Sequence, residues 1–185
     1  MKNSANGFTL IELLIVVAIV AVLAAIAVPS FNTMLVKRSV QGAATALVSD
    51  IRFTRSEAVR RSVGVSICSL AANSLNTCSA APANWANGWM VFVDPADTGT
   101  RGTRDVGEEI IRVQQPLSNI ATIQRSVNPS NTKLFFPFDA NGWSRAADEP
   151  FVVTPTGVVP PDTTRVVCVS TQGRVRLLVQ GATAC

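Results

Sequence analysis

The sequence contains no histidine and no tyrosine among its 185 residues. Histidine is the commonest general base and metal ligand in proteins, so its absence removes the usual Ser–His and Cys–His nucleophile pairs and most zinc sites. Charged residues are also few, 15% of the chain, and 16 basic against 12 acidic side chains give a net charge of +4. We therefore expect a protein that is not an enzyme and that uses no cofactor and no metal.

The scarcity of charge is concentrated near the N-terminus. Glu12 is the only ionisable side chain within residues 8–28, and residues 13–28 form an unbroken apolar run. As a helix, residues 8–28 would span about 31 Å at ~1.5 Å per residue, which is close to the thickness of a bilayer core. The run permits a membrane anchor or a signal peptide cleaved after Ala27. Glu12 fits neither well, because an acid inside an apolar helix is costly unless it has a partner.

The N-terminal residues resemble a known processing motif. Residues 7–15 read Gly-Phe-Thr-Leu-Ile-Glu-Leu-Leu-Ile, which is similar to the prepilin signature of type IV pilins and type II secretion pseudopilins. The resemblance implies that residues 1–7 are a prepilin leader peptide. It also implies that prepilin peptidase cuts after Gly7 and that the new N-terminal residue, Phe8, is methylated.

Processing at this site would create a charge pair. Cutting after Gly7 exposes an α-amine on Phe8, one helical turn before Glu12, and both charges need opposite partners in an apolar setting. We expect the amine of an incoming subunit to meet Glu12 of a neighbouring subunit. Such a pair would set the axial register of a filament, as one buried polar residue fixes register in a coiled coil.

Pro29, at a position where such pilins often carry a proline, removes a backbone donor and is expected to kink the helix. Beyond it, the spacing of apolar residues predicts an amphipathic half over residues 29–63. The helix should end near Ser62 or Val63, with Gly64 as its C-cap. The predicted apolar stripe consists of Val40, Ala43, Ala44, Leu47, Val48, Ile51, Ala58 and Val59.

After the helix, β-prone segments alternate with turn-rich ones. The predicted strands are Val65–Leu70, Gly88–Asp94, Glu109–Gln114, Lys133–Phe138, Phe151–Thr154, Arg165–Ser170 and Gly173–Gln180. These elements predict an α+β, pilin-like fold in which a long N-terminal helix packs on an antiparallel β domain. Residues 8–28 would be its transmembrane and assembly half, residues 29–63 its amphipathic half, and residues 64–185 a periplasmic β domain ending in a hairpin.

Three further segments narrow the resemblance. Residues 50–58, 88–94 and 134–142 look like the FimT/FimU/GspH group of minor pilins and pseudopilins. The resemblance implies a single-pass protein of the bacterial inner membrane that is periplasmic or extracellular once it joins a filament. The implied partners are other pilins or pseudopilins, prepilin peptidase, the inner-membrane assembly platform and the lipid bilayer.

The four cysteines lack the CxxC spacing of common zinc sites. An exported domain favours disulfides instead. Among the three possible pairings, we prefer Cys68–Cys78 with Cys168–Cys185, because both close short loops. In the loop-entropy model each bond stabilises the fold by about 3 kcal/mol.

Arginines gather in the last predicted hairpin. A two-residue turn within Ser170–Gly173 would pair Val169 with Arg174 and Val167 with Arg176. The alternation of side chains then puts three arginines on one exposed face and apolar residues on the other. The exposed set would be Arg165, Arg174 and Arg176, and the core set Val166, Cys168, Val175 and Leu177.

Guanidinium groups bind phosphate well because their donors form a planar fork. Residues 173–176, Gly-Arg-Val-Arg, also resemble the Gly-Arg-x-Arg motif of FimT-type pilins linked to DNA uptake. The resemblance implies that Arg174 and Arg176 contact the DNA backbone. The alternative is a solvated strand face on which arginines keep a sheet edge soluble.

Three functions follow from these patterns. The first is a structural subunit at or near the tip of a type IV pilus or type II secretion pseudopilus, acting in filament assembly and in pilus biogenesis or protein secretion. The second is a DNA-binding minor pilin of the FimT type acting in natural transformation. The third is a hydrolase or calcium site in the acidic segment 94–109, but arginines interrupt that segment, so a solvated loop is favoured. Trp85, Trp89 and Trp143 are read as core or rim residues rather than as stacking platforms.

The processing site yields a direct test. The mature protein should begin at N-methylated Phe8 and should retain residues 8–28. Intact-protein mass spectrometry and N-terminal sequencing measure this. A mature chain that begins after Ala27 would show cleavage by signal peptidase and would contradict the prediction.

Overall fold

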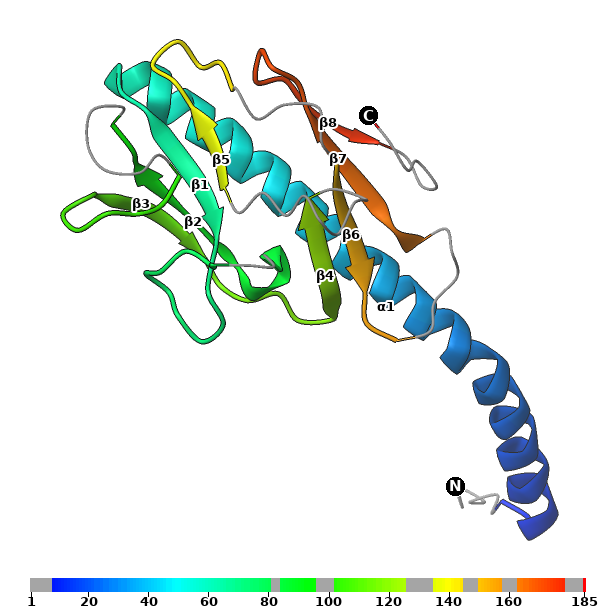
Figure 1. Ribbon diagram of the computed structural model, residues 1–185. Coiled ribbons are helices and arrows are strands. Elements are labelled where there is room, and N and C mark those ends of the chain that lie inside the picture. Colours follow the sequence, from blue (N-terminus) through cyan, green and yellow to red (C-terminus); the bar gives the residue numbers. More distant parts are fainter. Residues whose placement is uncertain are drawn as a thin grey trace, which may run out of the picture. The chain divides into compact units, whose positions relative to one another are not determined.

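The computed structural model describes residues 8–80, 84–95, 102–125, 135–144, 150–157, 163–178 and 185, apart from the side chains of residues 28–30 (Figure 1). The chain divides into two compact units, Met1–Leu35 and Val36–Cys185. One long helix, α1 (Leu10–Arg61), contributes to both units. The predicted N-terminal helix is therefore confirmed.

In the first unit, the apolar side chains of α1 are exposed around the whole helix. Leu10, for example, is 77% exposed, and Leu14 and Ile19 each have more than half of their surface exposed. This part of α1 contains an 18-residue window with a mean hydropathy of 3.1, and it is long and apolar enough to cross a membrane. An apolar helix without a buried face needs an apolar environment, either lipid or other helices.

The end of α1 is a Schellman motif. Ser62 has a left-handed φ of 53°. Its N–H donates to the carbonyl of Val59 at 3.3 Å, and the N–H of Val63 donates to the carbonyl of Ala58 at 3.3 Å. This is the bonding pattern that closes a helix when the residue after the C-cap is left-handed. The prediction that Gly64 forms the cap is therefore wrong, because Ser62 takes that conformation.

Two antiparallel four-stranded sheets follow in the described part of the chain. The first sheet has the order β3-β2-β1-β5, with β1 at Val65–Ser69, β2 at Trp89–Val93, β3 at Ile110–Gln114 and β5 at Phe135–Phe138. The second has the order β4-β6-β7-β8, with β4 at Ile120–Arg125, β6 at Phe151–Pro155, β7 at Arg165–Val169 and β8 at Val175–Leu178. A short 3-10 helix, η1 (Trp85–Asn87), precedes β2.

The antiparallel α+β fold is thus confirmed, and the structure locates a strand near each of the seven predicted ones. Residues 133–134 and 179–180, at the ends of two predicted strands, lie outside the described residues. Gly64 allows the first strand to begin directly after α1. A side chain there would overlap the carbonyl oxygen of Asp94, whose N–H donates to the carbonyl of Gly64 at 2.8 Å.

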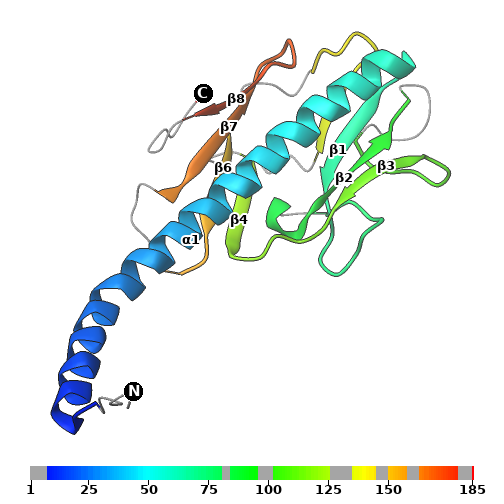
Figure 2. The ribbon, with the colours of Figure 1, turned by 180° about the vertical axis from the view of Figure 1, so that it is seen from behind.

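The second half of α1 lies across one face of both sheets, as Figure 2 shows from behind. Its buried side chains join residues from both sheets in one core. Seven of the eight predicted stripe residues are buried, namely Val40, Ala43, Ala44, Leu47, Val48, Ile51 and Ala58. Val59 is the exception and is 49% exposed. The helix therefore holds the two sheets together through its apolar stripe.

Strand β4 was not predicted from the sequence. Its pairing with β6 shifts register between Ile120 and Thr122, so the buried positions are Ile120, Ile123 and Arg125 rather than alternate residues. A bulge of this kind breaks the period of two by which strands are recognised. Arg125 also occupies a buried position, where the pattern would call for an apolar side chain.

Arg125 is accommodated by aromatic rings from both sheets. Its guanidinium carbon lies 4.7 Å from the ring centroid of Phe136 in β5 and 5.8 Å from that of Phe151 in β6. Its Nη1 also donates to the carbonyl of Phe135. Cation–π contacts of this kind are strongest where water is excluded, so this arginine belongs to the core.

Asp50 is a buried charge that ties α1 to the first sheet. It is 5% exposed, accepts a hydrogen bond from Nε1 of Trp89 at 2.8 Å, and pairs with Arg112 at 2.7 Å. Arg112 in turn lies over the ring of Phe53, 3.8 Å from its centroid. A buried carboxylate is tolerated when it is paired and hydrogen-bonded in this way.

Removing the Asp50 carboxylate should destabilise the fold. Asp50→Leu leaves the buried indole N–H of Trp89 without an acceptor, which costs about 1–3 kcal/mol and lowers Tm by about 2–4 °C per kcal/mol in a protein of this size. Asp50→Asn keeps an acceptor and should fall between this variant and the wild type. Thermal unfolding followed by circular dichroism measures the order. A leucine variant at least as stable as the wild type would contradict this role.

Candidate functional site

The hairpin of β7 and β8 does not have the predicted register. Val169 lies opposite Val175, and Cys168 lies opposite Arg176. Gly173 has a φ of 74°, and its N–H donates to the carbonyl of Ser170 at 2.8 Å. This is a three-residue loop with a left-handed glycine, which shifts the pairing by one residue relative to the predicted two-residue turn.

The register changes which arginines share a face. Arg165 is on the same face as the buried Val167, and its Nε donates to Oε1 of Gln41 in α1 at 3.1 Å. Arg176 is on the opposite face, beside Cys168. The prediction that Arg165 shares an exposed face with Arg174 and Arg176 is therefore wrong. Among the predicted core residues, Val175 and Leu177 do contact the core, whereas Val166 and Cys168 are buried on the other side.

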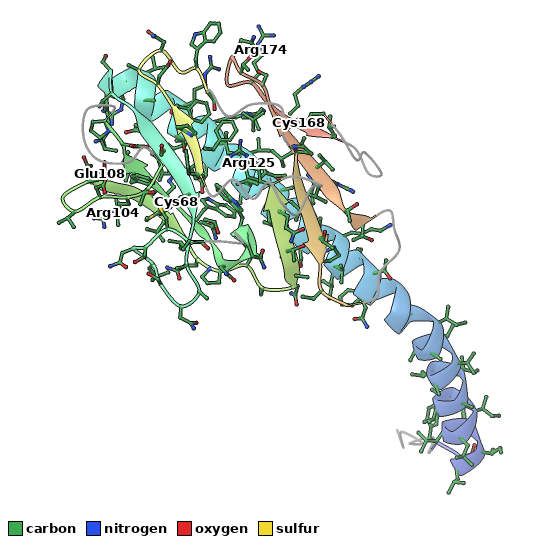
Figure 3. The ribbon with its side chains drawn as sticks, viewed as in Figure 1. Cys68, Arg104, Glu108, Arg125, Cys168 and Arg174 are labelled. Carbon is green, nitrogen blue, oxygen red and sulfur yellow. A yellow bond between two sulfur atoms is a disulfide. The ribbon has the colours of Figure 1, made fainter. Side chains whose placement is uncertain are left out.

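Arg174 lies in the turn between β7 and β8, as Figure 3 shows. The structure groups it with arginines of α1 rather than with Arg176. Together they line a groove of about 640 Å³, which is within the range of ~300–1,000 Å³ typical of ligand pockets. The lining residues are Arg52, Arg55, Ser56, Val59, Arg60, Gly173, Arg174 and Val175. We call this the arginine groove.

Two glycines allow the turns to approach Arg55. A Cβ on Gly173 would lie 2.7 Å from the carbonyl oxygen of Gly142 and 2.8 Å from Cδ of Arg55. A Cβ on Gly142 would lie 2.8 Å from Cγ2 of Val59. Both glycines have positive φ. Their conformation and their lack of a side chain therefore shape one end of the groove.

Glu57 neutralises the arginines at the end of α1. Its carboxylate accepts hydrogen bonds from Arg60 at 2.6 Å and from Arg61 at 2.8 Å, and Arg61 also pairs with Glu109 at 2.7 Å. The bonds from Arg60 and Arg61 lower the pKa of Glu57 to about 2. Among the groove arginines, Arg60 thus has a carboxylate partner.

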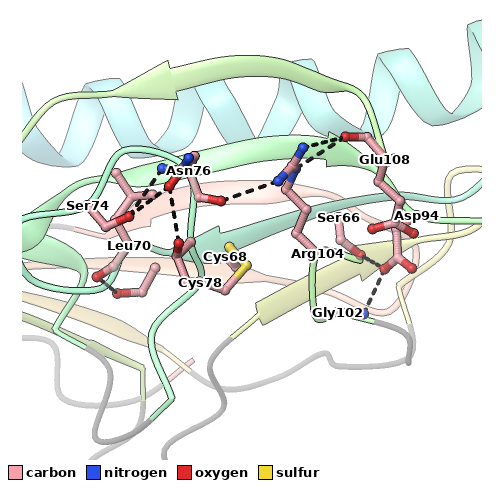
Figure 4. Close-up of a disulfide and its surroundings, with 12 residues drawn as sticks. Ser66, Cys68, Leu70, Ser74, Asn76, Cys78, Asp94, Gly102, Arg104 and Glu108 are labelled. Atoms are coloured by element: carbon pink, nitrogen blue, oxygen red, sulfur yellow. Dashed lines mark hydrogen bonds between the residues drawn. A yellow bond between two sulfur atoms is a disulfide. The ribbon is translucent and has the colours of Figure 1, made fainter. Parts of the chain in front are cut away.

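In the acidic segment 94–109, Asp94 is hydrogen-bonded to other residues of the same chain. Asp94 is almost completely buried and accepts hydrogen bonds from the hydroxyl of Ser66 and from the N–H of Gly102 (Figure 4). Burial, and then nearby charges such as Asp94, raises the pKa of Glu108. Within the described ranges, the acidic and cysteine side chains form no group of three that could hold a metal ion. Asp97 lies outside those ranges.

The predicted disulfide Cys68–Cys78 is confirmed, and it holds the loop that follows β1 (Figure 4). The two Cα atoms are 5.7 Å apart, and Leu70, directly after the end of β1, forms an isolated β-bridge with Cys78. The structure also joins Cys168 of β7 to Cys185, with the Cα atoms 5.6 Å apart.

The tryptophans differ in exposure. Trp85 and Trp89 are fully buried, and Trp85 packs edge-on against Phe151 with 5.1 Å between ring centroids. Trp143 is 54% exposed and lines a shallow hollow with Thr171. Trp85 and Trp89 are therefore core residues, as predicted.

Glu12 has a local role that the sequence analysis missed. Thr9 caps α1, since its Oγ1 accepts the N–H of Glu12 at 3.3 Å and its hydroxyl points to Oε2 of Glu12 at 3.5 Å. The spacing Thr-x-x-Glu is that of a capping box, so the signal was present in the sequence. Gly7 lies outside the described residues, and of Pro29 only the helical backbone is described.

These features define a class of protein. An apolar, exposed helix half with one acid precedes a unit in which the other half of the helix packs on antiparallel sheets. Residues 2–28 match the family model of the prokaryotic N-terminal methylation motif. The class is therefore that of pilin-type proteins.

The family follows from the second match. Residues 43–179, well over half of the chain, match the family model described as Type II transport protein GspH. The chain therefore belongs to the GspH family and carries the prokaryotic N-terminal methylation motif.

Individual relatives agree with this class. The type IV major fimbrial protein FimA of Dichelobacter nodosus is 52% identical over 40 residues, which are 22% of this chain and 25% of FimA. The match thus spans about a quarter of that relative's length. The crystal structure of the type IV minor pilin FimU of Pseudomonas aeruginosa is similar with a TM-score of 0.58 at 20% identity, covering 80% of this chain and 96% of FimU. A second crystal form of FimU gives 0.55 at 21% identity. The FimU structures support the fold.

Proposed function

We propose that the chain is an inner-membrane-anchored subunit that joins the filament of a type IV pilus or a type II secretion pseudopilus at or near the tip. There it takes part in pilus biogenesis or protein secretion. The observation that carries the proposal is the first half of α1, whose apolar side chains have no protein partner in the described part of the chain. Lipid surrounds this half before assembly, and the helices of neighbouring subunits surround it afterwards.

The proposal gives each region a place. Residues 1–7 are a leader that prepilin peptidase removes after Gly7, and Phe8 becomes the methylated N-terminus. Residues 8–28 cross the inner membrane once, Pro29 begins the amphipathic half of the helix, and residues 64–185 lie in the periplasm. The disulfides support this placement, because such bonds persist in oxidising compartments. The assembly platform of the inner membrane then passes the subunit to the filament.

Glu12 performs two tasks in this proposal. Within one subunit its carboxylate accepts a hydrogen bond from the hydroxyl of Thr9, the residue whose Oγ1 caps α1. In the filament its carboxylate pairs with the amine of a neighbour's Phe8, in surroundings where few other partners are available. The strength of a charge pair in a medium of low polarity makes a shifted register unfavourable.

Two substitutions of Glu12 separate these tasks. Glu12→Gln keeps a residue that suits the third position of a capping box but removes the charge, whereas Glu12→Ala removes both. Both variants should insert into the membrane, since the apolar run is intact, and both should fail to enter filaments efficiently. Cell fractionation measures insertion, and immunoblots of sheared filaments measure incorporation.

Normal incorporation of the glutamine variant would show that capping suffices and that the amine–carboxylate pair is not needed. Thr9→Ser serves as the control, because it alters the cap but keeps the hydroxyl and the charge. That variant should assemble like the wild type.

A second function is favoured by a specific observation: the subunit captures DNA during natural transformation. Arg174 and Arg176 are exposed, and in the described residues neither side chain has a carboxylate partner. Unpaired guanidiniums bind phosphates without reading the sequence, and such binding weakens as salt rises.

DNA capture predicts a salt-dependent complex. The purified chain in non-ionic detergent should retard a duplex oligonucleotide in a gel at low salt, and the complex should weaken with added salt. Arg174→Ala combined with Arg176→Ala should weaken it at least about tenfold, on the scale of a few lost phosphate contacts. The absence of any shift at low salt would dismiss DNA capture and leave the filament proposal untouched.

A further inference from the structure

The arginine groove brings together charges that lie far apart in the sequence. Arg52 and Arg55 come from α1, and Arg174 comes from the turn between β7 and β8 more than a hundred residues later. Val59 and Val175 are the apolar residues that line the groove between them. Positive charge therefore surrounds an apolar surface in a concavity.

The two helix arginines are positioned but not neutralised. Nη2 of Arg52 donates to the carbonyl of Val175 at 3.2 Å, and Nε of Arg55 donates to the carbonyl of Gly142 at 3.1 Å. Each guanidinium has five N–H donors, so several remain for a ligand. Both acceptors are neutral carbonyls, and the charge of each arginine is retained.

The surrounding acids do not offset this charge. Asp50 and Glu57 are the acids of α1 near these arginines, and each is bound elsewhere, Asp50 by Arg112 and Glu57 by Arg60 and Arg61. Arg52, Arg55 and Arg174 have no carboxylate partner among the described residues. The groove therefore contains three arginines without a carboxylate partner in the described part of the chain, whereas its fourth arginine, Arg60, pairs with Glu57.

We propose that the arginine groove binds the phosphodiester backbone of a nucleic acid, with Arg52 and Arg55 as phosphate ligands beside Arg174. The inference rests on the proposed DNA capture and deepens it. It moves the centre of the site from the pair Arg174 and Arg176 to the space between α1 and the turn. Arg176, on the far face of β8, then contributes at the periphery.

A polymer of phosphates fits this surface better than a single anion or an acidic peptide. Arg176, two residues beyond Arg174, adds a further exposed guanidinium outside the groove. A nucleic-acid backbone supplies one phosphate per nucleotide at regular spacing. Guanidiniums also match the geometry of phosphate oxygens through paired donors.

The test compares two double variants with the same change of charge. Arg52→Gln with Arg55→Gln removes the proposed ligands, and Lys37→Gln with Arg38→Gln removes two charges from the same helix, about 22 Å away along its axis. The full chain in non-ionic detergent is titrated against a fluorescent duplex oligonucleotide, and anisotropy gives Kd at several salt concentrations. Circular dichroism melting confirms that each variant is folded.

The proposal predicts a specific loss for the groove variant. Its Kd should rise at least about tenfold, and the slope of log K against log salt should fall by about 1.8, the value for two lost phosphate contacts. The control variant should change the slope by less than half as much. Arg52→Lys with Arg55→Lys restores the charge and should recover most of the slope.

Several results would overturn the inference. If the groove variant behaves like the control while Arg174→Ala with Arg176→Ala weakens binding, DNA capture stands and the groove is not its centre. If the wild type binds no oligonucleotide at low salt, both DNA capture and the groove assignment fail. Equal competition by a poly-glutamate peptide of the same charge would replace the nucleic acid by an acidic protein partner.

Discussion

The burial of one stripe of α1 against two sheets is the contact on which the rest of the structure depends. Neither sheet could cover its own apolar face, and the helix supplies the surface that joins them in a single core. The same helix begins with apolar residues on every side. The helix α1 thus has apolar residues on all sides in its first half and on one side in its second half. The change between these two patterns falls near the boundary between the two units of the chain.

The docked helix also determines the electrostatics of the second unit. Burial of the stripe directs Arg52 and Arg55 to the side where the β7–β8 turn arrives, and Gly142 and Gly173 let that turn come close. Asp50 and Glu57 on the same helix are each bound by arginines. These two acids are thus neutralised, whereas Arg52 and Arg55 have no carboxylate partner among the described residues. The groove is therefore positively charged because the nearby acids of α1 are paired with other arginines.

Much of this could be predicted from local sequence. The N-terminal motif, the stripe of α1 and most strands depend on residues that are neighbours in the chain, and so does the Thr9–Glu12 cap that was overlooked. Apart from the C-cap at Ser62, the errors concern features set by the pairing of strands. The bulge in β4 follows from pairing with β6, and the side of β7 that faces α1 follows from a turn longer by one residue. The grouping of Arg174 with Arg52 and Arg55 depends on this turn, because one shift of register moves every side chain to the other face of its strand.

The central claim is that the apolar segment survives processing as an assembly helix and that Glu12 pairs with the N-terminus of the adjacent subunit. A structure of the assembled filament by cryo-electron microscopy tests it most directly, through the distance between the Phe8 nitrogen of one subunit and the Glu12 carboxylate of its neighbour. The account predicts an ion pair, at about 4 Å or less. A filament in which Glu12 faces no amine, or a mature subunit without residues 8–28, would contradict it.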